Sequence, residues 1–209
     1  DADIYGPSIT KMFGTGTKDI KVIDQKIEPV IAHGVHTISI GNLVDPDSAT
    51  IWRGPLIHKA LTQMLTDVNW GELDYLIVDL PPGTGDVQIS LAQLMKITGF
   101  IAVSTPQEMS LADVVKAADM FKKVDVPLLG IVENMSYFIC DSCNKKHFIF
   151  GKSKVSSYAD KVNAGFFYQI PIEKSIMDSG ESGEPYAIKD ENDIYGELSS
   201  KLEKTVDKK

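Results

Sequence analysis

Residues 74–86 have the sequence DYLIVDLPPGTGD, and this stretch decides the expected fold. It opens on an apolar run with little polar alternation, which is typical of a strand buried on both faces of a parallel sheet. Runs of the same kind occur at 99–105 (GFIAVST) and 127–134 (PLLGIVEN). The segments that follow the first two runs have helical periodicity, with Asp86 and Ser110 as the expected N-caps. The alternation predicts an α/β fold with a parallel sheet.

Further elements extend this pattern at both ends. VHTISIG at 35–41 predicts a strand, and Pro55 stands at the expected first position of a helix. FFYQIP at 166–171 predicts a late strand, and an apolar residue at every fourth position over 194–202 predicts an amphipathic helix. We expect these elements to form one domain over residues 1–209.

Composition and charge exclude several classes of protein. Lys and Arg total 21 against 29 Asp and Glu in 209 residues, so the formal net charge is -8. This balance disfavours general binding to nucleic acid or to an anionic membrane. No apolar run approaches the ~20 residues that span a bilayer, and the opening DADIYGPS does not resemble a signal peptide. We therefore expect a cytoplasmic protein.

The acidic residue Asp79 follows the apolar run, at the carboxyl end of the predicted strand, where such sheets bind ligands. A carboxylate there commonly holds Mg²⁺ beside nucleotide phosphates, and the loop after it offers backbone N–H groups to a γ-phosphate. The alternative is that Asp79 ends a strand and caps a turn; the continuation PPGTGD favours the nucleotide interpretation. The loop consists of Pro81, Pro82, Gly83, Thr84 and Gly85.

Two other strand ends carry polar side chains. Asp1 and Asp3 precede the turn at Gly6 and Pro7, and such carboxylates can orient a water for phosphoryl transfer, although an Asp-rich loop is an equally simple interpretation. Asn134 follows the run at 127–134, where an amide can pair with an adenine edge or merely form a turn.

The two cysteines, Cys140 and Cys143, lie in a predicted metal loop at 135–150. They supply two thiolates, whereas tetrahedral zinc or a cubane cluster takes four ligands, so two chains related by a two-fold axis would complete the set. His147 offers an alternative, because C-x-x-C-x-x-x-H gives three ligands of a zinc knuckle. A redox dithiol is a further alternative, although no obvious helix opens at Cys140.

Six segments, in chain order, form a recognisable pattern: DADIYGPSI, IWRGPLI, DYLIVDLPPGTGDVQISLAQ, STPQEMSLADV, GIVENMSYFIC and SGESGEP. The most specific part is PPGTGD combined with ENMSYF-x-C-x-x-C. Together the segments resemble the Mrp/ApbC/Nbp family of P-loop ATPases, which belongs to the MinD/ParA group and carries or scaffolds iron–sulfur clusters.

The resemblance implies a three-layer, doubly wound sheet and an ATP-dependent carrier that transfers its cluster to apoproteins. It implies a [4Fe–4S] cluster bridging a homodimer through Cys140 and Cys143, and ATP with Mg²⁺ as cofactors. Asp3 would be the switch I aspartate that positions the attacking water, and Asp79 the Walker B residue acting on magnesium. Residues 81–85 would be the switch II loop. The implied adenine pocket consists of Asn134 and the loop around Pro171 and Glu173.

One part of the family pattern is missing from these residues. The glycine-rich Walker A loop, which ends in Gly-Lys-Ser or Gly-Lys-Thr, would lie just upstream of DADIYGPS. GTGTK at 14–18 and FGKSKV at 150–155 lack its spacing and are interpreted as surface loops. We expect the sequence to be a piece of a longer protein, and residues 1–209 alone to bind ATP poorly.

Two other functions stay open. A positioning ATPase of the MinD/ParA kind, with structural zinc at the cysteines, would act on DNA or a membrane. The acidic balance and the tail KLEKTVDKK, which lacks a large apolar face, argue against it. A metal-binding scaffold without enzymatic activity would also fit the missing Walker A loop.

Overall fold

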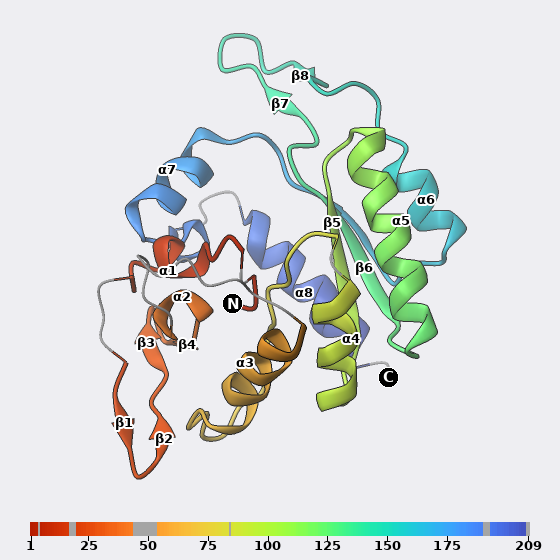
Figure 1. Cartoon of the computed structure of the whole chain (residues 1–209). Coiled ribbons are helices and arrows are strands. Elements are labelled where there is room, and N and C mark those ends of the chain that lie inside the picture. Colours follow the sequence, from red (N-terminus) through yellow and green to blue (C-terminus); the bar gives the residue numbers. More distant parts are fainter. Residues whose placement is uncertain (4, 17–19, 44–53, 84, 190–192, 208–209) are drawn as a thin grey trace. The chain divides into compact units, whose positions relative to one another are not determined.

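The computed structural model describes residues 1–3, 5–16, 20–43, 54–83, 85–189 and 193–207, and Figure 1 shows the path of the chain. The motif residues Trp52 and Arg53, and Thr84 of the predicted switch loop, fall outside this range. The chain forms two compact units. Unit 1 comprises residues 1–95 and 177–188, and unit 2 comprises residues 96–176 and 189–209. The expectation of one nucleotide-binding domain stays a prediction.

Unit 2 is built on a parallel sheet of three strands, in the order β5 (Phe100–Ser104), β6 (Leu128–Glu133) and β9 (Phe167–Gln169). The predicted strands at 99–105, 127–134 and 166–171 are therefore confirmed. Five of the six residues of β6 are buried, as expected of a central strand with both faces covered.

Helices cover both faces of this sheet. Helices α5 (Glu108–Lys123) and α6 (Val155–Lys161) share one apolar cluster with strands β5 and β6. Tyr168 of β9 donates a hydrogen bond of 2.8 Å to the carbonyl of Ile194 in α8 (Ile194–Val206). Figure 1 shows α8 on the side of the sheet away from α5 and α6, which confirms the three layers. The shared cluster consists of Ala102, Val114, Ile131, Val155 and Ala159.

The start of helix α5 differs from the prediction. Its N-cap is Gln107, and Ser110 lies inside the first turn. The Ser110 hydroxyl accepts a hydrogen bond of 3.1 Å from the Thr105 backbone N–H, so it closes the turn between strand and helix instead of capping the helix. Helix α4 (Gly85–Leu94) likewise begins one residue before Asp86, which was predicted to cap it.

Unit 1 packs helix α3 (Gly54–Thr66) against α4. It also holds the hairpins β1–β2 (Val22–Ile23, Lys26–Ile27) and β3–β4 (Val30–Ala32, Val35–Thr37), with the short helices α1 (Ile9–Met12) and α2 (Ile40–Leu43). The strand predicted over 35–41 ends at Thr37, since the chain enters helix α2 shortly afterwards. The core consists of Ala2, Ile38, Ile40, Ile57, Ala60, Leu61, Met64, Val68 and Val87.

The prediction of a strand over 74–80 is wrong. These residues are all described and belong to no strand, although the Ala2 backbone N–H donates a hydrogen bond of 2.8 Å to the Asp79 carbonyl. A ladder needs a neighbouring strand along its length, and the described residues provide none here. Ile77 is consequently 81% exposed despite its apolar neighbours in sequence.

The remaining elements are the hairpin β7–β8 (Phe138–Ile139, Lys146–His147), helix α7 (Lys174–Ser182) and a 3₁₀ turn, η1 (Tyr186–Lys189). The C-terminal part of α7 joins unit 1 through an ion pair of 2.5 Å between Lys11 and Glu181. Among the described residues, no helix has both the length and the apolarity to cross a membrane.

Candidate functional site

The carboxylates of Asp1 and Asp3 organise the first loop of unit 1. The Asp1 carboxylate accepts hydrogen bonds of 2.7 Å from the Ser39 hydroxyl and 3.3 Å from the Ile9 N–H. The Asp3 carboxylate accepts bonds of 3.1 Å from the backbone N–H groups of both Tyr5 and Gly6. One oxygen of Asp3 is thus used to hold its own turn. Its proposed role toward an attacking water stays a prediction.

Asp79 lies close enough to Asp3 for the two carboxylates to interact. Partial desolvation of its carboxyl group raises the pKa of Asp79, and the neighbouring Asp3 carboxylate adds to this rise. Two neighbouring carboxylates that repel each other form an arrangement that a divalent cation relieves. The residues present therefore fit a magnesium ion, which Asp79 would hold directly or through water.

The predicted switch II loop connects Asp79 to helix α4. Pro81 is buried, and its carbonyl accepts a hydrogen bond of 3.4 Å from the Gln88 side chain. Pro82 and Gly83 are exposed, and Gly83 has a left-handed backbone with φ 69°. Gly85 begins α4, so the last loop residue lies at a helix N-terminus, where backbone N–H groups favour anions.

The predicted adenine residues come together in unit 2. Asn134 follows β6, and its side-chain oxygen accepts a hydrogen bond of 2.9 Å from the Met135 N–H. Two backbone bonds join the segment after β6 to the segment after β9: Ser136 N–H to the Ile170 carbonyl (2.9 Å) and Ile172 N–H to the Tyr137 carbonyl (2.7 Å). Buried Pro171 and half-buried Glu173 therefore belong to a segment bonded to the one that follows Asn134.

Glu133, the last residue of β6, is fully buried and was missed by the sequence analysis. Its carboxylate accepts hydrogen bonds from the hydroxyls of Ser136 and Ser153 and, at 2.9 Å, from the side-chain amide of Gln169. Ser136 precedes the hairpin β7–β8 and Ser153 follows it. One buried carboxylate therefore fixes both ends of this hairpin to the sheet.

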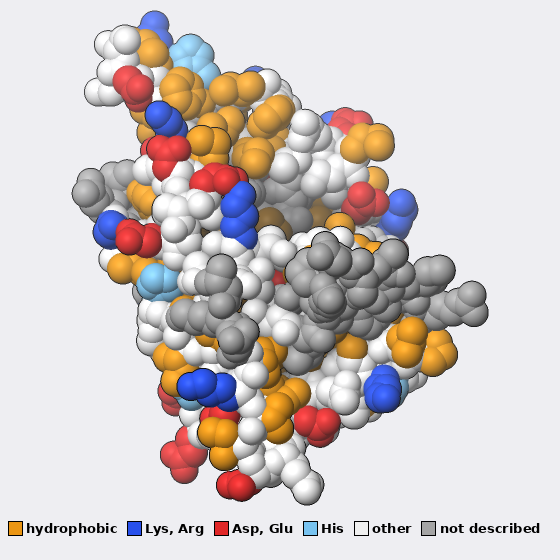
Figure 2. Space-filling view, turned by 60° about the vertical axis from the view of Figure 1, so that its left-hand side comes forward, with side chains coloured by type: hydrophobic (Ala, Val, Ile, Leu, Met, Phe, Trp, Pro, Cys, Tyr) orange, Lys and Arg blue, Asp and Glu red, His pale blue; other side chains and the backbone are white. Residues whose placement is uncertain are grey.

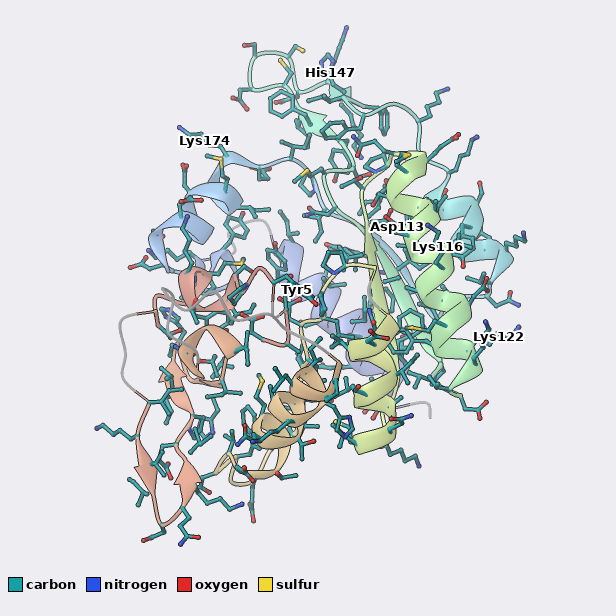
Figure 3. All side chains as sticks on the ribbon, in the orientation of Figure 1. Tyr5, Asp113, Lys116, Lys122, His147 and Lys174 are labelled. Carbon is teal, nitrogen blue, oxygen red and sulfur yellow. The ribbon has the colours of Figure 1, made fainter. Side chains whose placement is uncertain are left out.

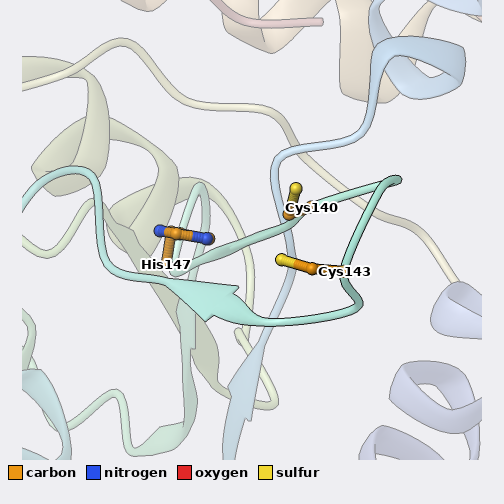
Figure 4. A group of neighbouring side chains, drawn as sticks. All are labelled: Cys140, Cys143 and His147. Carbon is orange, nitrogen blue, oxygen red and sulfur yellow. The ribbon is translucent and has the colours of Figure 1, made fainter.

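The two cysteines are free thiols near the tip of this hairpin, and Cys143 is exposed. The Cys140 N–H donates to the Lys145 carbonyl (3.0 Å), and the Asn144 N–H donates to the Cys140 carbonyl (2.8 Å). This turn brings the ligand atoms of Cys140, Cys143 and His147 within 4.8 Å of one another. Figure 3 shows His147 on the hairpin, and Figure 4 shows the three side chains gathered together.

The turn also prepares a thiolate. Hydrogen bonds from the backbone N–H groups of Ser142 and Cys143, and from the Cys143 thiol, lower the pKa of Cys140. The thiolate is the form that ligates metals, so this turn favours metal binding over an inert thiol.

An apolar surface lies beside the cysteines. The exposed hydrophobic residues Ile139, Phe148, Ile149 and Phe150 belong to β7 and to the segment that follows β8. Figure 2 shows a group of hydrophobic side chains at the top of the view, where Figure 1 has the hairpin β7–β8. We call these four residues the apolar rim. The sequence analysis missed it, although the run HFIF at 147–150 was a visible signal.

Comparison with known proteins identifies the class and then the family. The fold resembles that of P-loop NTPases: the cell division ATPase MinD of Pyrococcus furiosus matches with a TM-score of 0.58 at 19% identity, over 100% of this chain and 84% of that one. A nucleotide-binding protein of Archaeoglobus fulgidus, solved in complex with ADP and with cobalt found, matches with a TM-score of 0.76 at 39% identity, over 88% of this chain and 72% of that one.

The family model for ParA, described as NUBPL iron-transfer P-loop NTPase, matches residues 1–207. The chain therefore belongs to this family. The iron–sulfur cluster carrier protein of Aquifex aeolicus is 47% identical over 190 residues, which are 90% of this chain and 52% of that protein. A mitochondrial iron–sulfur protein required for NADH dehydrogenase in Arabidopsis thaliana is 43% identical over 206 residues, 99% of this chain and 66% of that protein.

The chain spans about half the length of bacterial relatives such as those of Aquifex aeolicus and Escherichia coli, at 52% and 51%. The resemblance to an iron–sulfur family and the expected P-loop fold class are confirmed.

Proposed function

We propose that the protein is an ATP-dependent carrier of iron–sulfur clusters. Two copies hold one [4Fe–4S] cluster as cargo between their Cys140 and Cys143 side chains and pass it to recipient apoproteins. The observation that carries this proposal is the hairpin turn, which holds an exposed thiol and a half-buried thiol close together and lowers the pKa of Cys140.

The ligand count supports a homodimer. A cubane cluster takes four thiolates, and one chain offers two. A two-fold axis brings the same patch of two subunits together and so supplies four. The apolar rim supports a protein contact at the same hairpin, because clustered exposed hydrophobic side chains are typical of an interaction surface.

The nucleotide supplies the second part of the proposal. Asp79 would hold the magnesium ion that accompanies the ATP phosphates, and Asp3 would position the attacking water. The loop from Pro81 to Gly85 would respond to the γ-phosphate, with helix α4 opening at its end. In unit 2, Asn134 and the segment of Pro171 and Glu173 would contact adenine. The ADP complex of the Archaeoglobus fulgidus protein supports nucleotide binding by this family.

The names of the relatives support the cargo. Proteins from Aquifex aeolicus and Escherichia coli that are 47% and 46% identical to this chain are called iron–sulfur cluster carriers. We extend this role to the present protein, together with a location in the cytoplasm and no direct action on nucleic acid or membranes. The formal net charge of -8 supports the last point.

Metal analysis of anaerobically reconstituted protein tests the proposal. We expect about four irons and four sulfides per dimer, lost in Cys140→Ser and in Cys143→Ser. Asp141→Asn is the matched control, because it changes an exposed residue of the same turn and keeps both thiols. About one zinc per dimer without sulfide would instead indicate a structural clasp and favour the positioning ATPase.

A further inference from the structure

We propose that one chain alone binds a single divalent cation of the zinc type through Cys140, Cys143 and His147. This mononuclear site and the bridging cluster exclude each other. The mononuclear site is independent of the function proposed above, whereas its competition with the cluster rests on that function.

The hairpin places the three ligands on one face. Phe138 pairs with His147 in the antiparallel register, and Cys140 follows Phe138 by two residues. Residues two apart on an extended chain point to the same side, so Cys140 lies on the face of His147, diagonal to it. Their ligand atoms and that of Cys143 lie within 4.8 Å of one another. Closure around one ion therefore needs only small movements of side chains.

The nearby cationic side chain of Lys146 lies on the face of the hairpin opposite the three ligands. Lys146 pairs with Ile139, and its ammonium lies 3.4 Å from the centre of the Tyr137 ring. Tyr137 and Ile139 alternate with Phe138 and Cys140 along the strand, so Lys146 extends away from the three ligands. The face that carries the thiols and the imidazole is thereby kept free of this positive charge.

The donor set selects the kind of metal. Two thiolates and one imidazole suit zinc and its tetrahedral substitutes, such as Co²⁺, better than magnesium or calcium, which take oxygen ligands. Cys143 and His147 are exposed, so water can occupy the fourth position. The site is complete enough for an ion within one chain and does not need a second copy.

The same geometry explains why the two occupants compete. A cluster shared by two chains takes both cysteines of each and leaves His147 without a role in ligation. A mononuclear ion uses both cysteines of one chain, which leaves no thiolate for a cluster. His147 therefore stabilises the cluster-free, single-chain state and contributes nothing to the cluster itself.

Titration of anaerobic, cluster-free protein with Co²⁺ tests the site, because thiolate ligation gives a charge-transfer absorption and tetrahedral geometry gives intense visible bands. We expect saturation at about one Co²⁺ per chain, with light scattering reporting a monomer. His147→Ala should weaken binding at least about tenfold and shift the visible bands. His36→Ala, which removes an exposed histidine of β4, should change neither.

The outcomes separate this site from the cluster. Saturation at half a Co²⁺ per chain, in a dimer and unchanged by His147→Ala, would overturn the proposal in favour of four thiolates from two chains. Iron content after reconstitution should be the same in His147→Ala as in the wild type. Loading with Zn²⁺ before reconstitution should reduce cluster assembly more strongly in the wild type than in His147→Ala. A cluster that assembles equally well on zinc-loaded protein would refute the competition. Absence of any cluster would overturn only the carrier function.

Discussion

The cysteine hairpin and the Asp79 loop are held in place by different kinds of contact. The hairpin places its three ligands within residues 140–147 and closes its turn with its own backbone hydrogen bonds. Asp79 depends on residues far away in sequence, since its carbonyl accepts a hydrogen bond from Ala2 and its pKa responds to Asp3. The comparison teaches that the proposed metal site is built from residues close together in sequence, whereas the proposed nucleotide site depends on long-range contacts.

The hairpin is nevertheless attached to the sheet by residues far apart in sequence. The variant Glu133→Ala removes this attachment. Ser136, Ser153 and Gln169 would lose their shared buried acceptor. Because these donors become unsatisfied and a cavity remains, the free energy of unfolding should fall by about 3 kcal/mol. Urea denaturation measures this loss, and amide hydrogen exchange should accelerate over residues 137–150.

Glu108→Ala is the matched control. Glu108 is also a glutamate of unit 2, but its side chain is 73% exposed in its ion pair with Lys154. An exposed pair contributes little, so this variant should lose far less stability than Glu133→Ala. Equal losses in the two variants would show that Glu133 does not anchor the hairpin.

Asn144→Ala tests how far the turn itself prepares the metal ligands. Asn144 has a left-handed backbone with φ 52°, which an alanine adopts at a cost of about 1 kcal/mol. We expect Co²⁺ affinity to fall about fivefold, because ligand binding must restore the turn. Asn144→Gly should retain wild-type affinity, since glycine adopts this conformation readily.

Asn163→Ala provides the comparison for this prediction. Asn163 has a similar φ of 51° but lies after α6, outside the cysteine hairpin. It should lose stability to a similar extent without any change in metal affinity. An affinity for Co²⁺ that is unaffected by Asn144→Ala would mean that the thiols and His147 find their positions without help from the turn.

The same contrast explains which features were predictable from the sequence. Strand β6 was predictable because its apolar run is buried on both faces, and β5 has a similar apolar run, although Val103 in it is exposed. The run at 74–80 looks alike in sequence but has no ladder among the described residues, and no local pattern distinguishes the two cases. Spacing alone identified the cysteine pair with His147.

Glu133 could not be identified in this way. Its three partners lie 3, 20 and 36 residues away in sequence, so no local motif connects them. Its position at the end of an apolar strand gave no hint that its side chain is buried. Ser110 was assigned to a helix cap for a related reason: the acceptor that it offers to Thr105 becomes visible only when strand and helix are joined.

The smallest expected effect concerns the other side of the comparison, Asp79→Asn. Because the folded state raises the pKa of Asp79 above its unfolded value of about 4, the folded state binds the proton more tightly. The stabilising contribution of this group is therefore present below pH 4 and is lost as the pH rises through the folded pKa. At neutral pH the ionised, partly desolvated carboxylate destabilises unit 1.

Asp79→Asn removes this titration, so the stability of the variant relative to the wild type should increase between about pH 4 and neutrality. The gain should stay below about 1 kcal/mol because the carboxyl group remains partly solvated. Thermal unfolding at a series of pH values measures it, with Asp74→Asn, an exposed carboxylate just before the same segment, as the control. If the difference in stability between Asp79→Asn and the wild type does not vary with pH, the pKa of Asp79 does not respond to burial or to Asp3. The long-range contacts of Asp79 would then have no electrostatic effect.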